Sequence, residues 1–334
     1  MIPFGNMIGK SVLCVTLGVL CFAQEATAEK IDAYYFDLSD PFTYSLAQAV
    51  KDETAKRGTE VIEHDASFNA DKQLSQVLAT ETGSPKLVNI VDPKLTAAII
   101  EKARNNSARL VFFNRPIESR LLKEYDQAFF VYNDSAECGR MQAHLIAKYI
   151  SKHHDIDKDG DGVIKTVLVR GEANNRDALL RSSNVLNALA ERMINVDKVA
   201  EFSADWVAEK AYNQMLGVIA DLGLDEIELI ICNNDAMALG VISALQQHGY
   251  NAGYNQDNYI PVFGVDAVPE ALKAVSDGTL AGTILNDAQT TARVAVALAL
   301  EQENNSARIK EREKLKIDDD GVIYVPYKMI TRID

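Results

Sequence analysis

Alternating acidic side chains in the stretch HDIDKDGDGVIKTVLV are suited to binding a hard divalent cation. Asp157, Asp159 and Asp161 occupy every second position, and Gly162 follows them. In helix–loop–helix calcium sites such a loop ends with a bidentate Glu at its twelfth position. Counting from Asp157, that position is Leu168, inside an apolar strand-like run. The pattern therefore predicts a calcium loop that runs into a strand and takes its last carboxylate from elsewhere. A solvated acidic turn is the alternative.

The elements that must position this loop alternate between short β-rich runs and helical segments along the whole chain. Runs such as Leu229-Ile230-Ile231 are apolar throughout, which favours a parallel sheet covered on both faces. We therefore predict an α/β fold with two consecutive three-layer α/β/α lobes and parallel sheets. The predicted strands are residues 30–36, 60–64, 86–91, 109–113, 128–132, 166–170, 198–202, 229–232, 262–265 and 282–285.

Polar and aromatic side chains follow most of these strands, at the sheet edge where ligands bind in such folds. Asp, Asn and Arg beside an aromatic ring suit a sugar, because each hydroxyl both donates and accepts and the ring covers the apolar C–H face. For any single residue the alternative is a helix cap or turn. The residues at these strand ends are Asp40, Phe42, Asn89, Asn174, Asn175, Asp177, Arg181, Trp206, Asn233, Asn234, Asp235, Asp266, Asn286 and Asp287.

Composition and the N-terminus bear on the compartment and on the partners. An apolar run over residues 11–23 precedes Ala26-Thr27-Ala28, which predicts a secretory signal peptide cleaved near Ala28 and an exported protein, with an uncut N-terminal anchor as the alternative. The net charge of −14 disfavours nucleic acid and anionic membranes as partners. Cys14 and Cys21 lie in the signal, and Cys138 and Cys232 are expected to be free buried thiols.

Six further stretches carry a resemblance that covers residues 30–327. The chain resembles the periplasmic galactose/glucose-binding proteins of bacterial ABC sugar importers. This resemblance implies a monomeric, non-catalytic receptor in the periplasm that captures D-galactose or D-glucose and presents it to an inner-membrane ABC permease, with a chemoreceptor as a second partner. The matching stretches are NIVDP (89–93), IIEKAR (99–104), VFFN (111–114), NNDAMA (233–238), VFGVDAVPEAL (262–272) and LAGTILNDA (280–288).

The resemblance also implies a domain organisation. Two lobes are joined by a three-segment hinge, with crossings expected near Asn114, Asn286 and Val325. Residues 1–28 are the signal peptide, residues 29–113 plus 287–321 the N-terminal lobe, and residues 114–286 plus 322–334 the C-terminal lobe.

The family's sugar ligands correspond to specific positions of this chain. Phe42 and Trp206 are expected to sandwich the sugar ring, and Asn175 stands where the family has a histidine. The full set of implied sugar-binding residues is Asp40, Phe42, Asn89, Asn175, Asp177, Arg181, Trp206, Asn234, Asp266 and Asn286.

The family also carries a structural Ca²⁺, which the resemblance places in the acidic loop. Its ligands would be the side chains of Asp157, Asp159 and Asp161, the carbonyl of Val163 and the distant carboxylate of Glu228. Lys165 stands where the family has a ligating Gln, and an ammonium group cannot ligate a metal. Either water takes that place or the lysine charge replaces the ion.

Two other functions remain open from the sequence. The Asn175 departure admits a receptor for a different monosaccharide, such as a pentose. A secreted glycosidase using Asp40 and Asp177 is the alternative from another class. We expect no catalysis, because amide neighbours and an Arg bind hydroxyls without raising a carboxyl pKa for proton donation.

Overall fold

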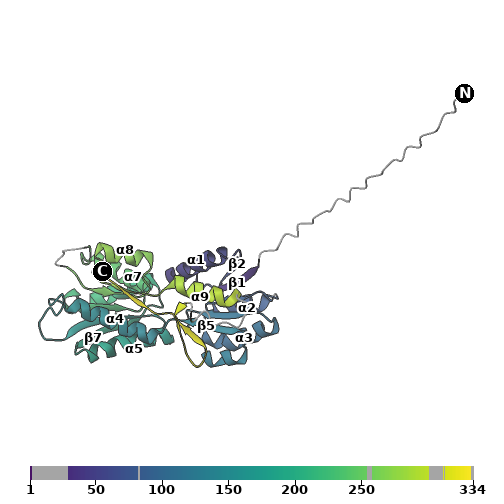
Figure 1. Ribbon diagram of the computed structural model, residues 1–334. Helices are drawn as coiled ribbons and strands as arrows, with labels where there is room; N and C mark the ends of the chain where they lie inside the picture. Colours follow the sequence, from purple (N-terminus) through teal and green to yellow (C-terminus); the bar gives the residue numbers. More distant parts are fainter. Residues whose placement is uncertain (2–28, 82, 254–257, 301–310, 312, 332–334) are drawn as a thin grey trace.

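The protein consists of two α/β lobes that lie side by side (Figure 1). The computed structural model describes residues 1, 29–81, 83–253, 258–300, 311 and 313–331. Apart from Met1, the predicted signal peptide with Cys14 and Cys21 lies outside the described residues. Within those described ranges, no helix has the length and apolar character needed to cross a membrane.

The first lobe is built on one sheet with the strand order β11-β12-β5-β4-β3-β1-β2. All neighbouring strands pair in parallel except β11 and β12, which form an antiparallel hairpin. The strands are β1 (Lys30–Tyr35), β2 (Glu60–Asp65), β3 (Lys86–Val88), β4 (Leu110–Phe113), β5 (Ala128–Tyr132), β11 (Lys316–Ile317) and β12 (Val322–Tyr324).

Helices cover both faces of this sheet because alternate strand residues point to opposite sides. Tyr35 and Phe113 lie in one apolar core with α1 and α9, whereas Tyr34 and Phe112 lie in the other with α2 and α3. The helices are α1 (Pro41–Ala55), α2 (Ala70–Ala79), α3 (Thr96–Asn105) and α9 (Ala288–Leu300), with short 3₁₀ turns η1 (Pro93–Leu95) and η2 (Ser119–Glu124).

The second lobe repeats this plan around the parallel strand order β7-β6-β8-β9. Helices α4 and α5 pack together, as do α6 and α7, and Leu168 and Val169 of β6 point into different cores. The strands of this sheet are β6 (Ile164–Arg170), β7 (Val196–Ser203), β8 (Leu229–Cys232) and β9 (Val262–Phe263). A separate antiparallel pair is formed by β10 (Thr283–Leu285) and β13 (Lys328–Ile330). The helices are α4 (Ser135–Ile150), α5 (Arg176–Glu191), α6 (Ala208–Leu222), α7 (Asp235–Gln247), α8 (Pro269–Asp277) and η3 (Leu224–Glu226). The predicted α/β fold with two parallel-sheet lobes is confirmed.

Strand pairing corrects the predicted lobe boundaries at two places. β5 pairs with β4, and β12 pairs with β5, so both strands belong to the first sheet although they were assigned to the second lobe. The reason is that β5 is apolar on both faces, with Val131 in one core of the first lobe and Phe130 in the other. The first crossing therefore follows Tyr132 and not Asn114.

The crossing segments meet through one buried side chain. Asn133 Nδ2 donates to the carbonyl of Val325 at 3.1 Å, and Thr291 Oγ1 donates to Asn133 Oδ1 at 3.4 Å. Asn133 follows β5, Val325 follows β12, and Thr291 lies one turn into the helix after β10. These hydrogen bonds fix the three crossings together at one edge of the first sheet.

Candidate functional site

A cavity lies between the lobes and collects the predicted sugar ligands, with the exception of Asn89. The first lobe contributes side chains that follow β1 and β4, and the second lobe contributes side chains that follow β6, β7, β8, β9 and β10. The lining residues are Phe36, Asp40, Phe42, Asn114, Arg115, Asn175, Asp177, Arg181, Trp206, Asn234, Asp266 and Asn286.

Several of these residues begin helices, which explains their position. The side chain of Asp40 accepts a hydrogen bond from Thr43 N at 2.7 Å and caps α1. Asn175 caps α5 and Asn234 caps α7 in the same way. Because a cap uses one side-chain oxygen, the cap and the ligand interpretations are compatible at these positions.

Asn89 lies elsewhere than predicted. It is fully buried, Oδ1 accepts from Phe36 N at 3.3 Å, and Nδ2 donates to the carbonyl of Phe113 at 3.3 Å. Both ends of its amide therefore bind backbone groups beside the ends of β1 and β4. In this arrangement Asn89 supports the cavity wall instead of lining it.

The Arg181 guanidinium lies at the buried end of the cavity. Nη1 donates to the Asn233 carbonyl at 2.7 Å and lies 3.9 Å from Asp266 Oδ1, while Nη2 donates to the Tyr327 hydroxyl at 3.1 Å. Arg181 Nε and Asn286 Oδ1 are buried without a hydrogen-bond partner among the described residues. Buried polar atoms are nearly always paired in folded proteins, so each of these two atoms has capacity for a further hydrogen bond.

Burial raises the pKa of every carboxyl group that lines the cavity. Burial raises the pKa of Asp40, although hydrogen bonds from Thr43 act to lower it. Burial also raises the pKa of Asp177, although the Arg181 charge acts to lower it. Burial raises the pKa of Asp266 to about 7, and the Arg181 charge limits the rise. The expectation that these carboxyls keep ordinary pKa values is therefore wrong, since it overlooked how completely the lobes enclose them.

Trp206 forms one wall of the cavity in a strained backbone conformation, with φ at +69°. A Cβ atom at Gly171 would lie 2.3 Å from the indole ring, so only glycine lets the ring lie against the end of β6. The indole Nε1 donates to Glu172 Oε1 at 2.8 Å, and the Arg181 guanidinium lies 5.7 Å from the ring centroid. Phe42 of the first lobe and Trp206 of the second both line the cavity.

A family model described as a periplasmic binding protein domain matches residues 35–306. The chain belongs to the periplasmic binding protein family. This family consists of binding proteins, and the chain is not an enzyme.

Among relatives, the chain is 33% identical to the D-galactose/methyl-galactoside binding periplasmic protein of Haemophilus influenzae, over 91% of this chain and 90% of that protein. It is 27% identical to a putative rhizopine-binding protein of Rhizobium meliloti, over 97% and 96%. Among solved structures, it is similar to an ABC transporter periplasmic solute binding protein from Actinobacillus succinogenes with bound D-allose. That match has a TM-score of 0.74 and 20% identity and covers 91% of this chain and 98% of the other.

The acidic loop of this periplasmic binding protein holds a cluster that could bind a metal ion. Oxygen atoms of Asp157, Asp159 and Glu228 lie within 4.8 Å of one another, so Glu228 lies where the missing carboxylate was expected. Glu228 accepts from Lys158 N at 2.6 Å and from Lys165 N at 2.8 Å.

The predicted ligand Asp161 is not part of this carboxylate cluster. Val163 N donates to Asp161 Oδ1 at 2.8 Å. Lys165 Nζ contacts Asp159 Oδ2 and Glu226 Oε2, each at 2.8 Å, and these hydrogen bonds raise the lysine pKa and lower that of Asp159. The oxygen donors suit a hard cation, and a lysine charge already lies against one of them.

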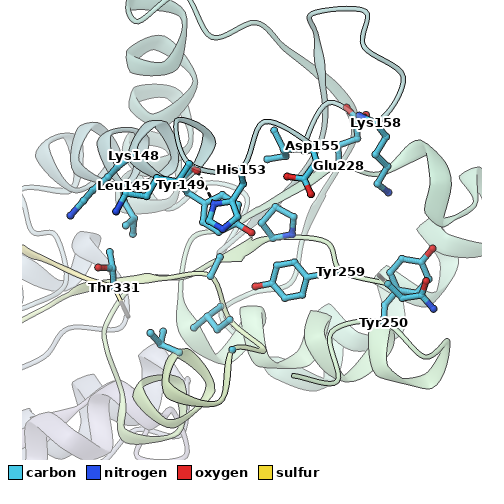
Figure 2. A pocket seen from close by; sticks show the side chains of 18 of the residues that line it. Leu145, Lys148, Tyr149, His153, Asp155, Lys158, Glu228, Tyr250, Tyr259 and Thr331 are labelled. Carbon is cyan, nitrogen blue, oxygen red and sulfur yellow. Dashed lines mark hydrogen bonds between the residues drawn. The ribbon is translucent and has the colours of Figure 1, made fainter. Parts of the chain in front are cut away.

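A larger cavity lies in the second lobe beside this loop (Figure 2). Its walls include the stacked rings of Tyr149 and His153, whose centroids are 3.9 Å apart. Apart from Glu228, no residue of either predicted site lines this cavity. The larger of these two cavities is therefore not the one that collects the predicted sugar ligands.

Sequence reasoning missed three residues that line the interlobe cavity, Phe36, Asn114 and Arg115. All three follow β1 or β4 directly, so the strand-end rule could have found them. The free thiols Cys138 and Cys232 were predicted correctly, since both are unpaired and buried.

Proposed function

We propose that this protein captures D-galactose or D-glucose in the periplasm and delivers it to an inner-membrane ABC permease. The observation that supports the proposal is that Arg181 and Asn286, which both line the interlobe cavity, each have a buried polar atom without a hydrogen-bond partner among the described residues, Nε and Oδ1 respectively. A pyranose hydroxyl can accept from the first atom and donate to the second. A signal peptide cleaved near Ala28 would take the protein to this compartment.

The cavity residues would make two kinds of contact to the sugar, hydrogen bonds and aromatic packing. Asp40 comes from the first lobe, and Asp177 and Asp266 come from the second. Their carboxylates would accept hydrogen bonds from sugar hydroxyls, and such charge-assisted bonds are stronger than neutral ones. Phe42 and Trp206 would cover the two faces of the ring. Because both lobes contact one ligand, binding would favour the closed arrangement.

A different monosaccharide, such as a pentose, is the second candidate, and Asn175 is the observation that favours it. Its Oδ1 accepts from Asp177 N at 2.8 Å and from Ala178 N at 3.3 Å. Only the amide nitrogen therefore remains for a ligand, and it reaches less far than a histidine ring. The relative from Haemophilus influenzae is named for D-galactose, which supports the first candidate.

Calorimetric titration of residues 29–334 with D-galactose, D-glucose and D-ribose tests both candidates. Micromolar or tighter hexose binding is expected, with a fluorescence change from Trp206, the single tryptophan of the chain. Asp266→Ala should weaken binding at least a hundredfold, because it leaves Asn286 Nδ2 and Arg181 without their carboxylate partner. Ribose binding without hexose binding would favour the second candidate, and no binding of either hexose would refute the first.

We further propose that Asp157, Asp159 and Glu228 bind a structural Ca²⁺, with Asp161 and the Val163 carbonyl as additional ligands. The ion would tie the loop after α4 to the start of β8. Lys165 would weaken the ion's binding, because its ammonium lies 2.8 Å from an Asp159 oxygen and repels a second cation.

Lys165→Gln tests this proposal, because it removes the repelling charge and supplies a neutral amide oxygen. We expect the variant to bind Ca²⁺ at least tenfold more tightly than the wild type and to gain more thermal stability on adding Ca²⁺. Lys152→Gln, an exposed position on the preceding segment, is the matched control. Melting temperatures unaffected by Ca²⁺ or EDTA in all three proteins would contradict a calcium site.

The remaining partners follow from the same proposal. A receptor of this kind acts as a monomer, with the permease and a chemoreceptor as its protein partners. Size-exclusion chromatography with light scattering tests the monomer.

A further inference from the structure

Arg115 is held against the first lobe by contacts that do not involve the second. Its Nε donates to the Ile90 carbonyl at 2.8 Å, its Nη2 donates to the Val91 carbonyl at 3.1 Å, and the guanidinium lies 4.4 Å from the centroid of the Phe36 ring. Arg115 as a whole residue is 7% exposed to solvent. These contacts hold the guanidinium in one place at the edge of the interlobe cavity.

Glu172 meets this guanidinium from the second lobe. It follows β6, and its Oε1 accepts from Arg115 Nη2 at 2.9 Å and from Trp206 Nε1 at 2.8 Å. One oxygen atom therefore joins a fixed cation of the first lobe to the aromatic wall of the second. The contact to Trp206 lies within one lobe, whereas the contact to Arg115 spans the two.

We propose that Glu172 is a positioning residue that latches the closed lobes and holds Trp206 in place. This inference rests on the proposed function, because the latch would act on a bound sugar. When the lobes separate, Arg115 would keep its backbone partners and Glu172 would keep the indole, so of these contacts the Arg115–Glu172 bond is the one that closure makes and opening breaks. A partly buried charged hydrogen bond of this kind should slow opening, and hence slow release of the sugar.

The two contacts of Glu172 can be separated by substitution. Glu172→Gln removes the charge that pairs with Arg115 but retains an oxygen that accepts from Trp206 Nε1. Glu172→Ala removes both contacts. Arg115→Gln removes the interlobe charge and leaves the Glu172–Trp206 bond intact.

Stopped-flow release of D-galactose, followed by Trp206 fluorescence, measures the latch. We expect Glu172→Gln and Arg115→Gln each to release sugar about tenfold faster, and the double variant to release it no faster than the single variants, because both remove the same contact. Glu118→Gln is the matched control, since the Arg120–Glu118 pair at 3.1 Å lies on one lobe with side chains 80% and 41% exposed. Wild-type release rates in Glu172→Gln, or fully additive effects in the double variant, would overturn the latch.

Acrylamide quenching of Trp206 in sugar-free protein tests the positioning role on its own. Glu172→Ala should raise the quenching constant above that of the wild type, whereas Glu172→Gln should leave it near the wild-type value. Equal quenching in all three proteins would overturn this role. A wild type that binds no sugar would refute the proposed function, and the quenching experiment would still decide whether Glu172 positions the indole.

Discussion

Asp266 is a buried carboxyl of the cavity whose raised pKa predicts a pH effect on stability. Its folded-state pKa is about 7 against an ordinary value of 3.8, chiefly because of burial. The folded protein therefore holds this proton more tightly than the unfolded chain. The sugar-free protein should lose stability from this group as pH rises from about 4 to 7, with no further loss above.

Sugar affinity should follow the opposite trend. A carboxylate accepts hydrogen bonds from hydroxyls better than a neutral carboxyl group does, so ligand binding favours the ionised form. We expect the affinity for D-galactose to rise between pH 5 and pH 7 and to level off above pH 7. Titration calorimetry across this range measures it. Asp266→Asn should bind more weakly at every pH and lose most of the rise, and a flat profile in the wild type would contradict the assignment.

At the scale of elements, the end of β6 determines where the aromatic wall stands. Gly171→Ala places a Cβ atom 2.3 Å from the Trp206 ring, closer than real contacts allow. We expect the indole to be displaced, sugar affinity to fall at least tenfold, and the free energy of unfolding to fall by about 1–3 kcal/mol, as in overpacked cores. Fluorescence titration and urea unfolding measure both effects.

Gly217→Ala is the matched control for this substitution. Gly217 lies within α6, where an added Cβ meets no atom within 4 Å. Because alanine favours a helix over glycine, the control should gain about 0.5–1 kcal/mol of stability and bind sugar like the wild type. If Gly171→Ala behaved like this control, the close packing of Trp206 on β6 would be refuted.

How far the sequence predicts the molecule also depends on the scale of its elements. Alternating β-rich and helical runs predicted the sheets, and the strand-end rule collected most of the residues around the cavity. It also collected Asn174, Asn233, Asp235 and Asp287, which do not line the cavity. It collected Asn89 as well, whose amide is buried with both ends turned toward backbone groups. The lobe boundaries implied by the resemblance were wrong for β5, since a strand with apolar residues on both faces does not reveal which of two parallel sheets it joins.

Electrostatic properties were the least predictable part of the site. The Glu172 oxygen contacts Arg115 and Trp206 from positions 57 and 34 residues away along the chain. No local pattern encodes such a contact, because it exists only when two lobes and three loops come together. The raised pKa values of Asp40 and Asp177 have the same origin in long-range burial.

At the scale of the whole molecule, the lobes are held together by chain crossings that share the side chain of Asn133. Asn133→Ala would leave the Val325 carbonyl without this donor and Thr291 Oγ1 without this acceptor, in a region that is almost fully buried. Removing one partner of a buried hydrogen bond costs about 1–3 kcal/mol. We therefore expect the free energy of unfolding, measured by urea denaturation, to fall by that amount. The matched control is Asn187→Ala, at an exposed position on α5, which should change the free energy of unfolding by less than about 0.5 kcal/mol.

Because the crossings set the relative placement of the lobes, Asn133→Ala should also increase the radius of gyration of the sugar-free protein in small-angle scattering. Equal stability and equal radius in the two variants would mean that the crossings do not depend on Asn133.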